Sequence, residues 1–211
     1  MEITFSPDEA LKASTLFVST GGRGFVVQGR GPRYVITAAH CLPWLPPAMT
    51  FSGTEERTYN KLLGKIGAEA DVAAECIFVD PVSDLAVLTS PDNQELSAEA
   101  DAYDALTDSL RALRIVALPN DALARPQPEG TPVWLLSLAC EDFKGSMLRH
   151  SHFASLKNLE GSVDGGMSGS PIVNADGHAV SLVTSTFQDP ALAQALPKWL
   201  VDELAAEEER R

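Results

Sequence analysis

Cysteine is scarce in this sequence of 211 residues, which contains only Cys41, Cys76 and Cys140. An odd and sparse set argues against a disulfide framework, because at least one thiol must stay unpaired within the chain. The sequence also has no CxxC or HExxH arrangement. A zinc or redox site therefore has little support, and no metal or cofactor is implied.

Positive charge is scarce as well. The chain has 16 Lys and Arg against 29 Asp and Glu, which gives a formal net charge of −13. Lys and Arg supply most contacts to phosphate backbones, so this balance disfavours a nucleic-acid partner. The charge would suit a basic peptide or a basic partner protein, but a high net charge often serves solubility alone. We interpret it first as a solubility feature.

Long hydrophobic runs are missing too. Compact apolar segments such as residues 133–140 are far shorter than the roughly 20 residues that span a bilayer, so no membrane partner is expected. Residues 1–9 lack the basic segment and the apolar run of a secretory signal. We therefore expect a soluble protein with a cytoplasmic location.

The length and the 45% hydrophobic content are consistent with one domain of two lobes. Short β-rich runs separated by glycine turns, such as the turn at residues 21–24, predict antiparallel strands. The predicted strands cover residues 15–20, 25–28, 34–37, 61–66, 72–79 and 85–89 in the first lobe, and residues 114–118, 133–139, 146–154, 171–173 and 178–186 in the second.

Three helices are expected. Residues 6–12 predict a short helix that starts at the N-cap Ser6 and covers one lobe. Residues 91–113 place apolar side chains at near-helical spacing among six acidic residues, which predicts an acidic amphipathic helix between the lobes. Its acidic face is mainly a solvated surface, and it is also the best candidate for a partner surface. Residues 197–209 predict a terminal helix whose buried side carries Trp199, Leu200 and Leu204.

The most informative stretch is the glycine-rich turn at residues 165–171, which places Ser168 ahead of an apolar strand. A serine hydroxyl is a weak nucleophile at neutral pH, so catalysis needs a base to take its proton and a third group to orient that base. The chain offers His40 within Thr-Ala-Ala-His-Cys and Asp84 within Ser-Asp-Leu-Ala-Val-Leu. Each motif alone is usually structural. Their joint occurrence, in this order and each beside a strand or turn, favours one catalytic site.

These three motifs resemble the chymotrypsin/trypsin-like serine endopeptidases, particularly the bacterial branch that includes the catalytic domain of the high-temperature-requirement proteases. The resemblance covers about residues 13–190. It implies an all-β fold of two six-stranded antiparallel Greek-key barrels. The C-terminal helix and the acidic helical insert, predicted above from residue spacing, lie outside the resemblance. The first barrel lobe then spans residues 13–113 with the insert at 91–113, the second spans 114–195, and the helix spans 196–211.

The resemblance also assigns catalytic roles, those of a serine endopeptidase that hydrolyses peptide bonds through an acyl-enzyme. His40 is the general base and then the general acid, Asp84 orients it, and Ser168 is the nucleophile. The N–H groups of Gly166 and Ser168 form the oxyanion hole. In many secreted relatives the cysteine after the histidine is bridged to an earlier one. No cysteine precedes Cys41 here, which fits a reducing compartment.

Substrate selection is expected from two segments. The resemblance places Ser162, six residues before Ser168, at the base of the primary specificity pocket. A serine lacks the carboxylate that selects Arg or Lys, which favours a small or medium apolar residue, although Asp164 and Glu160 leave a basic preference open. The second segment is expected to pair with the substrate backbone as an added β-strand. It consists of Thr184, Ser185 and Thr186.

Three further histidines have weaker claims to a function. His150 and His152 alternate on one face of a predicted strand, and His178 follows a turn. We interpret all three as surface or structural residues. The alternative is that one of the first two reaches the specificity pocket and recognises an acidic or amide side chain.

Two other functions compete with the endopeptidase. One is a catalytically silent or partner-activated protease-fold protein that binds partners through its cleft or its acidic helix. The other is an esterase or another acyl transferase that uses the same nucleophile. The expected partners are accordingly a protein or peptide substrate and, in the first alternative, a regulatory protein.

Met167 precedes the serine, at the position where proteases activated by chain cleavage carry an aspartate that pairs with the new N-terminus. We predict that the intact chain is active without such processing. Comparing the peptidase activity of the intact chain with that of a limited-proteolysis product tests this expectation. Strong activation that depends on a new N-terminal amine would contradict it.

Overall fold

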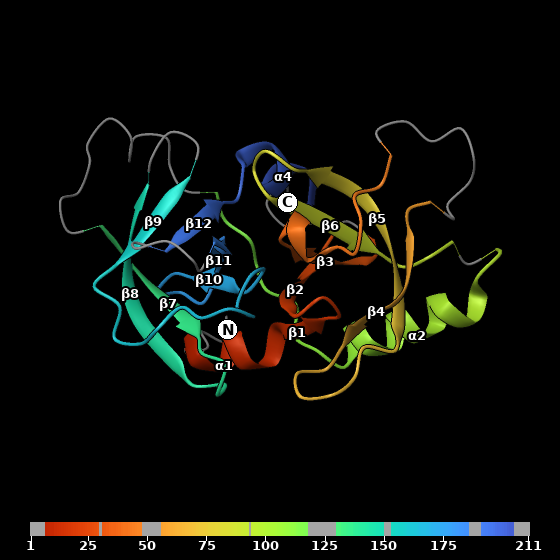
Figure 1. Cartoon of the computed structure of the whole chain (residues 1–211), viewed down its shortest axis with the longest axis horizontal. Helices are drawn as coiled ribbons and strands as arrows, with labels where there is room; N and C mark the ends of the chain where they lie inside the picture. Colours follow the sequence, from red (N-terminus) through yellow and green to blue (C-terminus); the bar gives the residue numbers. More distant parts are fainter. Residues whose placement is uncertain are drawn as a thin grey trace, which may run out of the picture.

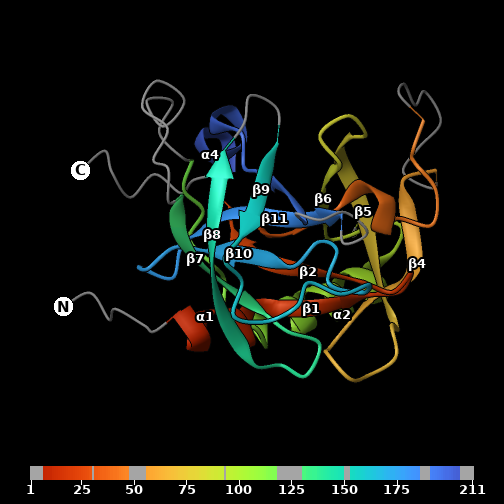
Figure 2. The same cartoon turned by 60° about the vertical axis from the view of Figure 1, so that its left-hand side comes forward.

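The strands of this protein form two closed antiparallel barrels of six strands each, which lie side by side (Figure 1). The structure is a computed structural model that describes residues 7–29, 31–47, 56–92, 94–117, 130–149, 153–185 and 191–204. Helices lie around the barrels and not inside them, as Figure 2 also shows. The predicted all-β double barrel is thus confirmed.

The first barrel contains the six strands that the sequence predicts in the first lobe. They are β1 (Thr15–Val18), β2 (Gly22–Gln28), β3 (Arg33–Thr37), β4 (Thr58–Gly64), β5 (Val72–Asp80) and β6 (Leu85–Thr89). Their order around the barrel is β1-β2-β3-β6-β5-β4, and the barrel closes where β1 pairs with β4. This order is the Greek-key arrangement.

The second barrel follows the same plan. Its strands are β7 (Thr131–Leu136), β8 (Asp142–Arg149), β9 (Ala154–Lys157), β10 (Pro171–Val173), β11 (Ala179–Ser185) and β12 (Leu192–Ala195). Their order is β10-β11-β12-β9-β8-β7, and the barrel closes where β10 pairs with β7.

Several strand boundaries differ from the predicted ones. The predicted strand at 146–154 is divided between two antiparallel strands, β8 and β9. Of the predicted strand at 114–118, residues 114–117 are described and contribute a bridge between Ile115 and Ala179. Residues 22–24, predicted as a turn, begin β2. The short strand β12 was not predicted, because its sequence Leu-Ala-Gln-Ala has little of the β-branched or aromatic character typical of strands.

The two barrels share part of their hydrophobic core. Buried side chains of the first barrel form one cluster with four residues of the second. Fully burying a Leu or Val side chain contributes about 1.5 to 3 kcal/mol to stability relative to leaving it exposed. Packing across the seam therefore helps to fix how the two barrels sit against each other. The four second-barrel residues are Leu136, Val173, Ala179 and Leu182.

Two short helices cover opposite ends of the seam between the barrels. Helix α1 (Pro7–Ser14) packs against β7 and β10, and α4 (Lys198–Leu204) lies at the other end (Figures 1 and 2). Leu200 and Leu204 are buried, because residues four apart share one helix face. Trp199 was expected on that face but is 52% exposed, and its ring meets that of Phe78 in a T-shaped arrangement with centroids 4.9 Å apart.

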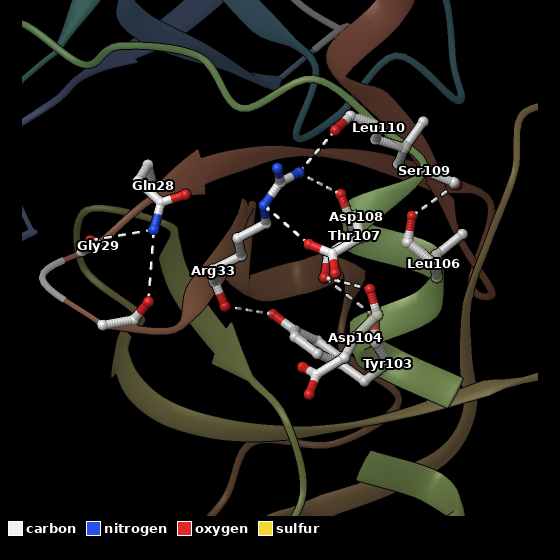
Figure 3. A network of polar contacts seen from close by, with 11 residues as sticks. Gln28, Gly29, Arg33, Tyr103, Asp104, Leu106, Thr107, Asp108, Ser109 and Leu110 are labelled. Carbon is white, nitrogen blue, oxygen red and sulfur yellow. Dashed lines mark hydrogen bonds and ion pairs between the residues drawn. The ribbon is translucent and has the colours of Figure 1, made fainter. Parts of the chain in front are cut away.

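Helix α2 (Ser97–Asp108) is shorter than the predicted 91–113. The Arg33 side chain closes its C-terminal end (Figure 3): Nη1 donates to the carbonyls of Thr107 and Leu110 at 2.5 and 2.7 Å, and Nε pairs with Asp108 at 3.2 Å. A cation at this end also interacts favourably with the helix dipole. Within the described residues, no helix combines the length and the apolar character needed to cross a membrane.

Tyr103 anchors α2 to the first barrel. Its buried hydroxyl is hydrogen-bonded to the carbonyls of Arg33 and Leu88, at 3.1 and 3.2 Å, on the neighbouring strands β3 and β6. Figure 3 shows the bond to Arg33. We expect Tyr103→Phe to lower the free energy of unfolding by about 1 to 2 kcal/mol, since the variant removes the one O–H that the two carbonyls share. Urea denaturation measures this change.

The matched control is Tyr34→Phe, because the Tyr34 hydroxyl makes no hydrogen bond to the residues that the structure describes. This variant should keep the wild-type denaturation midpoint. An equal loss of stability in both variants would show that the Tyr103 hydroxyl bonds do not carry the effect.

Candidate active site

The pairing of β3 with β6 brings His40 and Asp84 together. Thr37, the last residue of β3, lies opposite Ala86 of β6. His40 follows Thr37 in a short 3-10 helix (Ala39–Cys41), and Asp84 immediately precedes β6. The two residues are therefore neighbours because the register of one strand pair is fixed, although they are distant in the sequence.

His40 and Asp84 are joined by two hydrogen bonds. The ring Nδ1 of His40 lies 2.7 Å from Asp84 Oδ2, and the His40 backbone N–H donates to Oδ1 at 3.0 Å. Asp84 has a φ of +52°, a left-handed conformation that aspartate adopts more readily than most residues. Its own carbonyl accepts the N–H of Ala39 at 3.2 Å. Backbone and side chain of Asp84 thus both hold the histidine segment.

The environment of His40 favours its protonated form. The hydrogen bond to Asp84, and second the adjacent Cys41 side chain, raise the pKa of His40 from 6.5 to about 10, against the opposing effect of burial. The side chain of His40 is half exposed. The raised pKa therefore favours an imidazolium paired with Asp84.

Ser168 lies in the second barrel, in the turn that precedes β10, and is 8% exposed. Its hydroxyl donates to the carbonyl of Thr184 on β11, over 3.4 Å. Among the described residues, no hydrogen bond joins Ser168 to His40. The first barrel nevertheless holds the serine carbonyl, which accepts the N–H of Arg23 at 2.7 Å and lies 3.6 Å from the Cys41 sulfur.

The backbone before Ser168 forms a type II turn. The N–H of Met167 donates to the carbonyl of Asp164 at 3.1 Å, and Gly166 at the third position has a φ of +98°, which this turn requires. Within the described part of the chain, the N–H groups of Gly166 and Ser168 find no protein acceptor. They remain available to an oxygen atom of a ligand.

Gly169 fixes the other side of the serine. Its φ is +81°, and a Cβ added there would lie 1.9 Å from the carbonyl oxygen of Arg23. Any side chain at this position would separate the serine turn from β2. The turn thus approaches the first barrel as closely as a glycine permits.

The predicted specificity residues are only partly described. Ser162 is exposed, and its hydroxyl donates to Asp164 Oδ2 at 2.6 Å. Thr184 and Ser185 end β11, whereas Thr186 lies outside the described residues. His178 precedes the other end of β11 and donates its N–H to the Asn174 side chain at 3.0 Å. His150 and His152 also lie outside the described residues, so their predicted roles stay predictions.

The sequence reasoning missed Arg23. Its side chain is only 4% exposed, and it donates to the carbonyls of Leu136 and Ser137 at 2.8 and 3.0 Å. A charged residue between two glycines is typical of an exposed turn, which is how residues 21–24 were interpreted. The apolar run that begins at Phe25 could have indicated the burial of Arg23. If the strand is extended back to Gly22, Arg23 becomes part of the sheet.

The family of this chain follows from its sequence as well as its geometry. A family model described as a trypsin-like peptidase domain matches residues 22–182, a span that includes His40, Asp84 and Ser168. The chain belongs to this family. A comparison of this chain with curated protein sequences found no significant match.

Three solved protease structures share its fold. The Rv3671c protease in an inactive form aligns with a TM-score of 0.54 at 16% identity, over 95% of this chain and 93% of that one. A human pathogenic astrovirus serine protease aligns with a TM-score of 0.54 at 14% identity, over 88% and 90%. The MamO protease domain from Magnetospirillum magneticum aligns with a TM-score of 0.52 at 15% identity, over 93% and 98%. At such identities the likeness concerns the fold alone. The narrower resemblance to the high-temperature-requirement branch stays a prediction.

The ion pair of His40 and Asp84 predicts a pH dependence of stability. Because the folded-state pKa of His40 lies above its usual 6.5, the pair stabilises the fold fully below pH 6.5, and this contribution is lost as the pH rises towards 10. Titrating the histidine resonances by NMR should show one midpoint near 10. It should move towards 6.5 in Asp84→Asn, which removes the charged acceptor.

The resonance can be assigned by its loss in His40→Gln. A wild-type midpoint for His40 below pH 7, or a midpoint that Asp84→Asn leaves unchanged, would contradict the role of this carboxylate.

Proposed function

We propose that this trypsin-like peptidase domain is a serine endopeptidase that hydrolyses peptide bonds through an acyl-enzyme, with His40, Asp84 and Ser168 as its catalytic residues. The observation that carries the proposal is the hydrogen-bonded His40–Asp84 pair, in a barrel that also holds the carbonyl of Ser168 through Arg23. The type II turn adds further support, since it leaves the N–H groups of Gly166 and Ser168 without protein acceptors among the described residues.

In the proposed reaction, the Ser168 Oγ forms a bond to the substrate carbonyl carbon while His40 Nε2 takes the hydroxyl proton. The carbonyl oxygen becomes an oxyanion and accepts hydrogen bonds from Gly166 and Ser168, an effect typically worth about 100- to 1,000-fold in rate per donor. The imidazolium then protonates the leaving amine, and the C–N bond breaks. Water attacks the acyl-enzyme in the same way, which releases the acid and restores Ser168.

Two features of the resting site must change before this reaction. His40 has to lose its extra proton, and Ser168 has to rotate about its Cα–Cβ bond, because its hydroxyl donates to Thr184. These features favour a second candidate function, a partner-activated or catalytically silent binding protein. A substrate or partner backbone N–H that occupied the Thr184 carbonyl would release the serine hydroxyl. This exchange would link binding to activation.

The end of β11 supports the proposed mode of substrate binding. The ladder between β11 and β12 is irregular between Val183 and Ser185, the position of Thr184. Where a ladder is irregular, backbone N–H and C=O groups stay unpaired and can form hydrogen bonds with another strand. We propose that Thr184, Ser185 and Thr186 pair there with the substrate backbone, and that Ser162 favours a small or medium apolar residue in the primary pocket.

A fluorophosphonate probe tests the proposed nucleophile. We expect the intact protein to be labelled on Ser168, and labelling to disappear in Ser168→Ala and in His40→Ala. The rate should rise with pH, since the pKa of His40 is raised to about 10 and only the neutral ring accepts the serine proton. Mass spectrometry of the adduct and the pH profile of labelling measure both effects.

Ser170→Ala is the matched control. This serine lies two residues from Ser168, is fully buried, and makes no side-chain hydrogen bond to the described residues. Its removal should leave labelling unchanged. The absence of labelling at any pH, with or without candidate partners, would reject the endopeptidase and favour the silent binding protein. Turnover of esters but never of peptides would favour the acyl transferase instead.

A further inference from the structure

Arg23 carries a buried charge without a carboxylate partner. Its side chain is 4% exposed, and within the described residues no Asp or Glu forms an ion pair with it. Burial lowers the pKa of its guanidinium from the usual value. A buried charge is costly, and an apolar side chain of the same volume often stabilises a protein equally or better. The presence of arginine here requires a reason other than stability.

The guanidinium crosses the seam between the two barrels. Its two terminal nitrogens donate to consecutive carbonyls of the second barrel: Nη1 to Leu136 at 2.8 Å and Nη2 to Ser137 at 3.0 Å. The planar fork of arginine suits two neighbouring acceptors, because its donors point in fixed directions. The side chain thus sets both the position and the orientation of the end of β7.

The segment held in this way touches the type II turn. Residues 137–141 form the tip of the β7–β8 hairpin, where Cys140 N–H donates to Ser137 at 3.0 Å and Ser137 N–H donates to Glu141 at 2.8 Å. Leu138 lies at this tip, 3.5 Å from where a Cβ on Gly166 would be. The carbonyl oxygen of Gly21, two residues before Arg23, lies 3.3 Å from the same point.

The backbone of Arg23 holds the serine itself. Its N–H donates to the Ser168 carbonyl at 2.7 Å, and its carbonyl accepts the Thr37 hydroxyl at 2.7 Å while lying against Gly169. The backbone of Arg23 therefore contacts the serine turn, and its side chain contacts the β7–β8 hairpin beside that turn. Both contacts start from the same strand, β2.

We propose that Arg23 is a positioning residue for the nucleophile: its backbone places Ser168, and its buried guanidinium places the hairpin tip that confines Gly166, the proposed oxyanion donor. This inference rests on the proposed function of that turn. Directed hydrogen bonds from Arg23 fix two segments that apolar packing would leave free to slide.

The test compares two arginines of this chain. Arg23→Met keeps the volume but removes both carbonyl bonds, and Arg33→Met removes two carbonyl bonds and an ion pair at the end of α2 (Figure 3). Fluorophosphonate labelling should slow roughly 10- to 100-fold at saturating probe in Arg23→Met, since small misplacements in a catalytic site cost this much. The half-saturating probe concentration should change by less than about twofold, because the loss is one of reactivity and not of binding.

Arg33→Met should lower the melting temperature and keep the wild-type labelling rate below that temperature. Arg23→Lys keeps the charge without the two-pronged geometry, and its rate should fall between those of the wild type and Arg23→Met. This variant decides the question if Arg23→Met does not fold. A wild-type labelling rate in every folded Arg23 variant, or an equal loss of rate in Arg33→Met, would overturn the proposal.

Hydrogen–deuterium exchange separates this inference from the proposed function. In the Arg23 variants, the amides of residues 136–140 and 164–170 should exchange faster than in the wild type, whereas those of α2 should not. This result is expected even if the probe fails to label the wild type, which would reject the endopeptidase alone. Unchanged exchange in both segments would reject the positioning role of Arg23, whatever the activity.

Discussion

A backbone hydrogen bond joins the two halves of the candidate site: the N–H of Arg23 on β2 donates to the carbonyl of Ser168. His40 and Asp84 belong to the first barrel and the serine turn to the second, so their relative position depends on contacts across the seam. Glycine at position 169 lets the two backbones approach, and a Cβ there would prevent this bond. Apolar packing holds the barrels together, while this bond fixes where the serine lies within that packing.

The arrangement of the candidate site in this structure differs from the one that the proposed mechanism needs. The carboxylate of Asp84 holds a proton on His40, and the Ser168 hydroxyl donates to Thr184 instead. An imidazolium accepts no hydrogen bond from a hydroxyl, so the raised pKa of His40 is compatible with a serine hydroxyl that donates elsewhere. In the proposed mechanism the same carboxylate orients the ring and stabilises the charge that forms on it. In that mechanism, the strong His40–Asp84 pair stabilises the imidazolium that forms during the reaction. It also delays the first step, because His40 must lose a proton before it can accept the one on Ser168.

The sequence predicted most where local patterns decide the structure. All six strands of the first barrel follow runs of apolar residues between turns, and His40 and Asp84 follow from motifs beside two of them. The missed features depend on tertiary contacts. Strand β12 has few strand-forming residues and exists because β11 and β9 pair with it. The buried state of Arg23 and the exposed state of Trp199 both depend on which distant segment lies against them, which no local pattern encodes.

The division of the site between two barrels has a consequence for synthesis. The strands of the first barrel end with Thr89, so His40 and Asp84 can pair once that barrel has left the ribosome. The serine comes much later, and its turn is held by β11, through the carbonyl of Val183 that accepts the N–H of Gly169. A nascent chain thus carries the proposed base long before it carries a positioned nucleophile. In the proposed mechanism, such a chain is unreactive until the second barrel has been made as far as β11.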